Sequence, residues 1–244
     1  MRPLSSRELL QVWEWGETQH PVDRALTLLV LACPETSPEK LTQLSIGQRD
    51  TLLLTLREWT FGSDLNSLAT CPSCGEYLEL NFTVADIQVS PEVNPTQEHS
   101  LSFADYEVSF RLPNSSDLAT IAGHQDTLAA RQTLLEICVL VASYQGESFS
   151  IQELPSPVME AVVEKMAQAD PQADVQLALS CPGCKHQWQA TFDIVSYFWS
   201  EINAWAKRIL LEVHTLASAY GWGEADILAM SPRRRQLYLE MVSQ

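Results

Sequence analysis

Apolar and polar side chains alternate along this chain with two different periods. Over roughly the first sixty residues the apolar positions recur at three- and four-residue steps, which predicts helices. Ser5 and Glu8 form a capping-box pair ahead of the first helix, and a second helix is expected over about 21–33. A third apolar run closes at Gly62, a typical helix stop.

A two-residue period, typical of half-buried strands, follows in three places. The inward positions of these predicted strands are Leu78, Leu80, Phe82 and Val84, then Tyr106, Val108, Phe110 and Leu112, then Trp188, Ala190 and Phe192. The stretch Ser90–Ser100 has two prolines and no period, which predicts a loop.

Helical periodicity returns between and after these strands. Helices are expected soon after Asn114, over 125–144 and over about 157–169, and the apolar run Leu134–Ala142 is interpreted as buried helix. One apolar stripe then continues from Val195 until glycines end it near 221, and a short helix and a terminal helix follow. The pattern predicts an α+β protein that is mostly helical.

These elements divide the chain into five segments. We expect an N-terminal helical region over 1–64, a first cysteine turn with strands over 65–112, an inserted helical region over 113–175, a second cysteine turn and strand over 176–194, and C-terminal helices over 195–244.

Composition and charge narrow the class of protein. Hydrophobic residues make up 45% of the 244 residues, which indicates a folded globular protein. No apolar run approaches the ~20 residues needed to cross a bilayer, and the N-terminus lacks the pattern of a signal peptide, so we expect a cytoplasmic protein without direct membrane insertion. The net charge is −16, and residues from Ile194 onward are neutral overall, so the acidic excess lies before them. Such a surface disfavours nucleic acid and suits protein partners.

Two cysteine pairs carry the clearest chemical signal. "CPSCGEYLELNF" begins at Cys71 and "CPGCKHQWQATF" begins at Cys181, a constant offset of 110 residues without gaps. Each unit is a cysteine turn followed by a strand with matching inward positions, which indicates a short internal duplication.

A C-x2-C turn presents two thiolates on one tight loop, and two such turns supply the four ligands of a tetrahedral zinc ion. Cys71, Cys74, Cys181 and Cys184 are the predicted ligands of one zinc ion per chain, in a small antiparallel zinc-ribbon-like element. The 106 residues between the pairs would form a helical insertion. Four thiolates leave no open position on the metal, so its role would be structural.

Other interpretations of the cysteines are weaker. A thioredoxin-like redox pair would open a helix, whereas each pair here precedes a strand. Structural disulfides are unusual in a cytosolic protein. His186 is an alternative ligand but is expected at the surface, and Cys33 and Cys138 lie in apolar stretches as core residues.

No catalytic constellation can be assembled, so we expect a protein that is not an enzyme. The sequence offers no Ser/His/Asp set, phosphate loop or helix with two metal-binding histidines. His214 is expected to be partly buried and hydrogen-bonded, and Glu160 and Glu164 are expected on a solvated helix face.

The C-terminal helices contain a candidate partner-binding surface that is basic and aromatic. Arg and aromatic side chains are favoured at interface hot spots. The candidate residues are Trp222, Arg233, Arg234, Arg235 and Tyr238.

Several blocks of the sequence resemble baseplate (hub assembly) proteins of contractile-tailed phages and phage-tail-like contractile injection systems. The block "GWGEADILAMSPRRRQLYLEM" is the most specific, and the other blocks are "IGQRDTLLLTLREWTFG", "CPSCGEYLEL", "FRLPNSSDLATI" and "CPGCKHQWQATFDI". The resemblance implies a non-enzymatic protein that helps to build the baseplate or forms part of it, with hub or wedge proteins as partners. The family's cysteine pairs carry over to Cys71, Cys74, Cys181 and Cys184.

Three hypotheses follow. The first is a zinc-stabilised assembly factor or adaptor of such a baseplate. The second is a zinc-ribbon regulator that binds nucleic acid, although "GEYLEL" places acids where such a ribbon would carry Lys and Arg. The third, a zinc enzyme, requires an open metal position.

Overall fold

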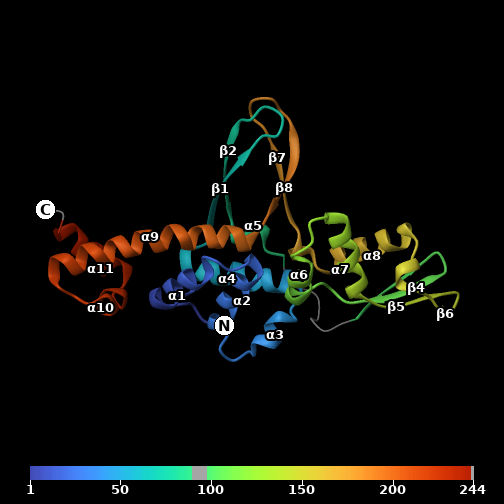
Figure 1. Cartoon of the computed structure of the whole chain (residues 1–244). Helices are drawn as coiled ribbons and strands as arrows, with labels where there is room; N and C mark the ends of the chain where they lie inside the picture. The colour runs from blue at the N-terminus through green and yellow to red at the C-terminus, as the bar shows by residue number, and fades with distance from the viewer. Residues whose placement is uncertain (90–97, 243–244) are drawn as a thin grey trace. The chain divides into compact units, whose positions relative to one another are not determined.

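A computed structural model of the chain describes residues 1–89 and 98–242. The chain divides into two compact units (Figure 1). Unit 1 consists of Met1–Glu35 and Ile194–Gln244, and unit 2 consists of Thr36–Asp193. The five segments expected from the sequence stay a prediction about domains.

Unit 1 is helical within the described residues. Its helices are α1 (Ser6–Gly16), α2 (Pro21–Ala32), α9 (Ile194–Tyr220), α10 (Glu224–Leu228) and α11 (Pro232–Val242). The predicted capping box is present, since the Ser5 side chain accepts from the Glu8 amide and the Glu8 carboxylate accepts from Ser5. None of the helices in the described part of the chain is both long and apolar enough to cross a membrane.

The apolar stripe of α9 forms the core of unit 1, as its period predicted. Buried residues of α9 pack with Leu10 of α1 and with Ile227 and Leu228 of α10. At the other end of α9, Trp199 lies against Gly16 so closely that an added Cβ there would come within 2.4 Å of its ring. Glycine at position 16 therefore permits α1 to approach α9.

Unit 2 combines helices with three small antiparallel sheets. Its helices are α3 (Pro38–Thr42), α4 (Ile46–Phe61), α5 (Val84–Ile87), α6 (Ser115–Ile121), α7 (Thr127–Cys138) and α8 (Ser156–Ala169), with 3-10 turns η1 (Ile151–Glu153) and η2 (Pro171–Ala173). Its strands are β1 (Asp64–Thr70), β2 (Tyr77–Thr83), β3 (His99–Phe103), β4 (Tyr106–Phe110), β5 (Val139–Tyr144), β6 (Glu147–Ser148), β7 (Val175–Ser180) and β8 (Gln187–Phe192). The sheets are β1-β2, β3-β4-β5-β6 and β7-β8.

The helix expected over 125–144 is wrong over its last six residues. Helix α7 ends at Cys138, and Val139–Tyr144 forms strand β5 beside β4. Val139 and Ala142 are buried with Val108 and Phe110 in a core that α8 also enters. An apolar run of this length fits a buried helix or a buried strand equally well, and the partner strand β4 decides between them.

Other expectations were incomplete. Strands β1 and β7, which precede the cysteine turns, were not predicted. The predicted loop over 90–100 lies mostly outside the described residues, and its last two residues, His99 and Ser100, belong to β3. His214 is exposed and not partly buried, because it lies off the apolar stripe of α9.

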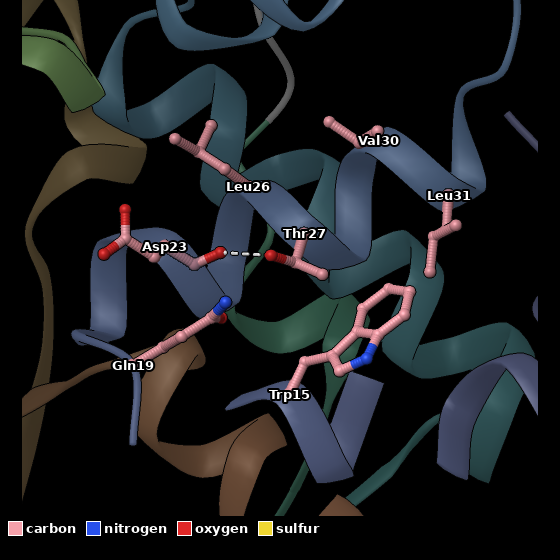
Figure 2. Close-up of a pocket in the computed structure, with 7 residues that line it drawn as sticks. All are labelled: Trp15, Gln19, Asp23, Leu26, Thr27, Val30 and Leu31. Carbon is pink, nitrogen blue, oxygen red and sulfur yellow. Dashed lines mark hydrogen bonds between the residues drawn. The ribbon is translucent and has the colours of Figure 1, made fainter. Parts of the chain in front are cut away.

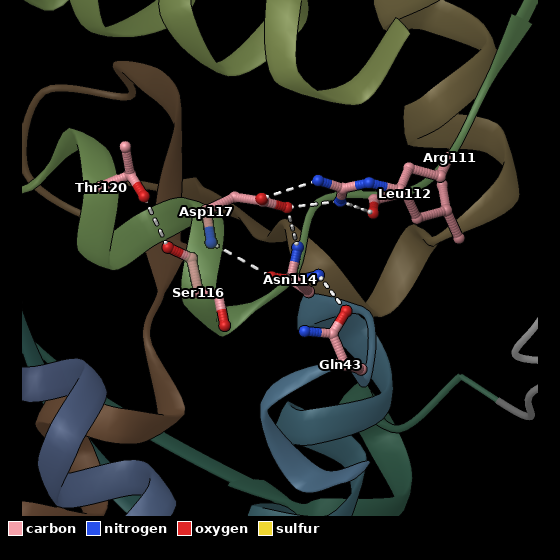
Figure 3. A network of polar contacts seen from close by, with 7 residues as sticks. All are labelled: Gln43, Arg111, Leu112, Asn114, Ser116, Asp117 and Thr120. Carbon is pink, nitrogen blue, oxygen red and sulfur yellow. Dashed lines mark hydrogen bonds and ion pairs between the residues drawn. The ribbon is translucent and has the colours of Figure 1, made fainter. Parts of the chain in front are cut away.

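A polar network holds the start of α6 within unit 2 (Figure 3). Asn114 caps the helix by accepting from the Asp117 amide, and the Asp117 carboxylate accepts from the Asn114 amide. Arg111 binds both oxygens of that carboxylate at 2.6 and 2.8 Å, and the Asn114 side chain donates to Gln43 at 3.1 Å. This bidentate pair connects the end of β4 to α6, and the Asn114–Gln43 hydrogen bond connects the start of α6 to the segment after α3.

Candidate metal centre

The two cysteine turns have the same backbone structure. In the first, Gly75 N–H donates to the carbonyl of Cys71 at 2.9 Å, and Cys71 N–H donates to Glu76 at 2.8 Å. In the second, Lys185 N–H donates to Cys181 at 3.0 Å, and Cys181 N–H donates to His186 at 2.9 Å. Gly75 and Lys185 both have positive φ, at 77° and 61°. Glycine at position 75 is therefore favoured by the turn.

The strands on either side of each turn also correspond. Thr70 pairs with Tyr77 in the first hairpin, and Ser180 pairs with Gln187 in the second, so the register is the same at an offset of 110 residues. The duplication therefore comprises a whole hairpin, β1-β2 or β7-β8, whereas the sequence showed only its second strand. Figure 1 shows these two hairpins side by side.

The turns bring the four predicted ligands together. The Sγ atoms of Cys71, Cys74, Cys181 and Cys184 all lie within 4.8 Å of one another. The Sγ of Cys71 is 3.6 Å from that of Cys184, and the Sγ of Cys74 is 3.6 Å from that of Cys181. Among the described residues this is the one cluster of three or more Cys, His, Asp or Glu with metal-binding geometry.

These distances fit a metal ion better than a disulfide. A disulfide requires sulfur atoms about 2.05 Å apart, and all four cysteines are free thiols. In a tetrahedral site with Zn–S bonds of about 2.3 Å, neighbouring sulfur atoms would be roughly 3.8 Å apart. The four thiols therefore fit a tetrahedral thiolate-bound ion such as zinc.

The environment of the thiols differs between the first and second cysteine of each pair. Cys71 and Cys181 are buried, whereas Cys74 and Cys184 are exposed. The His186 amide lowers the pKa of the Cys184 thiol to about 7. The Glu76 amide has the same effect on Cys74, but hydrogen bonds with the other thiols outweigh it and raise the pKa of Cys74 to about 12. The backbone of each turn thus directs an amide at a sulfur that would carry negative charge.

Little apolar packing holds the hairpins together at this end. The buried cluster consists of Cys71, Cys181 and Leu78, with Ala69, Leu80 and Trp188 partly buried against it. Farther from the turns, Phe82 and Phe192 meet edge to face at 5.6 Å between ring centres. They occupy equivalent positions in the two hairpins.

The remaining candidates for metal ligation do not join the cluster. His186 is exposed, as predicted, and its ring stacks on Trp188 at 5.9 Å. Cys33 and Cys138 are buried core residues, also as predicted, and burial raises the pKa of the Cys138 thiol to about 11.

A comparison with known families places this site in context. A family model described as "T4 bacteriophage base plate protein" matches residues 5–199, a range that includes both cysteine pairs. The chain belongs to the T4 bacteriophage base plate protein family. This confirms the family resemblance for the blocks within residues 5–199, whereas the block that begins at Gly221 lies outside the matched range. No curated protein and no solved structure matches the chain.

The family match of this baseplate protein ends inside α9, so the candidate partner surface lies beyond it. Trp222 stacks on Tyr220 at 4.4 Å and meets Tyr238 edge to face at 4.8 Å. The Arg234 guanidinium lies 5.7 Å from the centre of the Tyr238 ring. Arg234 and Tyr220 are exposed, whereas Trp222 and Tyr238 are partly buried against the core of unit 1.

The three consecutive arginines of the baseplate protein point in different directions. Arg233 and Arg234 are exposed, but Arg235 is only 4% exposed, donates to Glu212 at 2.8 Å and donates to the carbonyl of Met230 at 3.1 Å. Successive helix positions are about 100° apart, so three adjacent residues cannot share one face. The expectation of one patch that includes all three arginines is therefore wrong for Arg235, and helical geometry alone could have separated it from its neighbours.

Proposed function

We propose that this protein is a non-enzymatic assembly factor or adaptor in the baseplate of a phage-tail-like contractile injection system. The observation that carries the proposal is the family match over residues 5–199, which supports a baseplate-related structural role. The fold is consistent with such a role, since its best-formed chemical site is a four-thiolate cluster suited to holding structure.

The metal in this proposal is a structural zinc ion, one per chain, bound by Cys71, Cys74, Cys181 and Cys184. Four thiolates would complete its coordination and leave no position for a substrate. The ion would tie hairpin β1-β2 to hairpin β7-β8, and thereby fix both ends of the segment between them. This supports a role in shape and not in catalysis.

The alternative, a zinc-ribbon regulator that binds nucleic acid, is disfavoured by charge. Unit 2, which carries the hairpins, holds 21 of the 31 acidic residues and seven of the 15 Lys and Arg, a net charge of −14. Of the seven basic residues, Arg49 and Arg57 are buried. A surface of this sign repels phosphate backbones.

The proposed docking surface for a hub or wedge protein is the aromatic group of Tyr220, Trp222 and Tyr238 with Arg234. Flat aromatic side chains and Arg give large contact areas at low entropic cost, which is why they dominate interface hot spots. Arg235 would act from behind this surface, because its ion pair with Glu212 holds α11 on α9.

Metal analysis tests the zinc proposal. Purified protein should contain about one zinc per chain. The cobalt-substituted protein should show the absorption spectrum of a four-thiolate site. A metal content near zero in protein that retains its fold would overturn the assignment, and a spectrum with oxygen or nitrogen ligands would reopen a catalytic role.

Affinity purification tests the adaptor proposal. The tagged protein, expressed with the other proteins of its particle, should retain a hub or wedge subunit. Arg234→Glu should reduce that recovery, whereas Arg131→Glu, a change of an exposed arginine on α7, should leave it unchanged. Failure to retain any baseplate subunit would count against the adaptor proposal. Equal recovery with both variants would count against the proposed docking surface.

A further inference from the structure

Unit 1 contains a groove on the surface of α1 and α2 (Figure 2). Its volume is about 410 Å³, and all its lining residues belong to unit 1: Trp15, Gln19, Asp23, Leu26, Thr27, Val30 and Leu31. Figure 2 shows that Gln19 and Asp23 lie at one end, whereas Trp15, Val30 and Leu31 lie at the other. Trp15 is 53% exposed, which is unusual for so large an apolar side chain. The groove therefore has a polar end and an apolar end.

The polar end contains hydrogen-bond acceptors. The Asp23 carboxylate is exposed there, whereas Oε1 of Gln19 is buried and out of reach of an occupant. The Thr27 hydroxyl is occupied, because it donates to the backbone carbonyl of Asp23 at 2.8 Å. An occupant of the groove that brought a positively charged donor to the exposed Asp23 carboxylate would satisfy this end.

Helix α11 carries a stripe with the matching properties. Arg233, Leu237 and Met241 follow one another at four-residue steps and thus lie along one side of the helix. Arg233 is exposed, Leu237 is 50% exposed and Met241 is 61% exposed. This stripe begins with a cation and continues with two large apolar side chains. It lies beside the aromatic surface that includes Arg234 and Tyr238.

The spacing along the two helices agrees. Asp23, Thr27 and Leu31 follow one another along α2 at the same four-residue steps. Each set spans eight residues, or about 12 Å at the rise of an α-helix. If the two helices run parallel, Arg233 faces the end with Gln19 and Asp23, and Met241 reaches the end with Leu31.

The distribution of charge allows two copies to meet through unit 1. Unit 1 holds eight of the Lys and Arg and ten of the Asp and Glu, a net charge of −2, whereas unit 2 carries −14. Both surfaces in question belong to unit 1. Contact through unit 1 therefore avoids the strong repulsion that unit 2 would cause.

We infer that the protein self-associates, with α11 of one copy bound in the α1–α2 groove of a second copy and parallel to its α2. Arg233 donates to the Asp23 carboxylate of the other copy, and Leu237 and Met241 cover Trp15 and the apolar end. When each copy binds the α11 of the other in its own groove, the same contact is made twice and the product is a two-fold dimer. This inference goes beyond the baseplate role and does not depend on it.

Sedimentation and light scattering of the purified full chain test the inference. For a contact between one helix and one groove we expect a Kd of ~10 µM, so that protein at ~100 µM is mostly associated. The mass should be at least twice the 27.3 kDa of one chain and should return to one chain on dilution. A single-chain mass across this range overturns the inference.

Two sets of variants locate the contact. Leu237→Glu should weaken association at least ~30-fold, because it places a carboxylate in the apolar end of the groove. Leu68→Glu is the matched control: it changes a leucine on β1 that is 70% exposed but lies outside the proposed contact, and it should leave association unchanged. Asp23→Arg and Arg233→Asp should each weaken it roughly fivefold, and the double variant should recover most of the loss. Circular dichroism and the thermal midpoint show that each variant is folded. Association that ignores Leu237→Glu, or a double variant as weak as the sum of the two single changes, overturns the inference.

Discussion

Removal of the proposed metal ion should disorder the two cysteine hairpins and leave the core around α8 intact. The perturbation is chelation under reducing conditions, followed by metal analysis to confirm removal. The amides that report on the turns are those of Cys71 and Cys181, which donate to Glu76 and His186 in the closed turns.

The magnitude follows from how little else holds this end of the hairpins. Three residues are buried in the cluster, Cys71, Leu78 and Cys181. At ~2 kcal/mol for each buried apolar side chain, their burial contributes about 6 kcal/mol at most. A structural zinc site contributes on the order of 10 kcal/mol, and an isolated two-stranded hairpin is marginal in water. The proposed metal ion would therefore stabilise this end more than the apolar packing does, and without it the hairpins should open.

Hydrogen exchange with mass spectrometry measures this opening. We expect protection of the peptides that contain β1-β2 and β7-β8 to fall at least ~100-fold, which corresponds to ~3 kcal/mol. Peptides from α8 (Ser156–Ala169) should change little, because its buried residues belong to a different core cluster. Cys33→Ala supplies a matched control, since it removes a buried thiol outside the cluster and should retain the metal. Unchanged protection in metal-free protein would refute the reasoning that the ion holds the hairpins.

Three further predictions concern stability. Arg235→Ala should lower the free energy of unfolding by ~3 kcal/mol in denaturant titration, because it leaves the partly buried Glu212 without its 2.8 Å ion pair; a loss near zero would contradict this. Gly47→Ala should lower the free energy of unfolding by about 2 kcal/mol or more in the same assay. The new Cβ would come within 2.0 Å of the Asp170 carboxylate, which accepts from the Gly47 amide at 2.9 Å. A variant of unchanged stability would show that this contact relaxes freely. Burial raises the pKa of Asp50 to about 6 from 3.8, so the folded state binds a proton more tightly than the unfolded chain. The stability that this group contributes is therefore present below pH ~4 and is lost as the pH rises to about 6. The loss is roughly 2–3 kcal/mol, and Asp50→Asn should flatten that part of the pH profile; an unchanged profile would contradict the assignment.

Local sequence rules anticipated several elements of the fold. The capping pair of Ser5 and Glu8 and the apolar stripe of α9 depend on residues within a few positions of one another. The cysteine spacing likewise predicted the ligand set, because a C-x2-C turn presents both sulfurs locally. The structure places all four sulfurs within 4.8 Å of one another, which agrees with that prediction.

Other features required the neighbours that only folding supplies. The run at Val139–Tyr144 has no period that separates helix from strand, and it becomes a strand because β4 offers a hydrogen-bonding edge. Strands β1 and β7 likewise take their structure from the strands that follow each cysteine turn. The inward position of Arg235 depends on Glu212, which is 23 residues away in the chain.

By itself, the sequence determined which segments have helical or strand periods, which four thiols form two C-x2-C pairs, and which family the blocks resemble. The tertiary structure decided that the pairs meet across 106 intervening residues, that each belongs to a complete hairpin, and which arginine is buried. The physical reason is the separation along the sequence between the residues that interact. Turns, caps and periodicity arise from contacts between residues close in sequence, whereas convergence, strand pairing and burial depend on contacts whose partners only packing brings together.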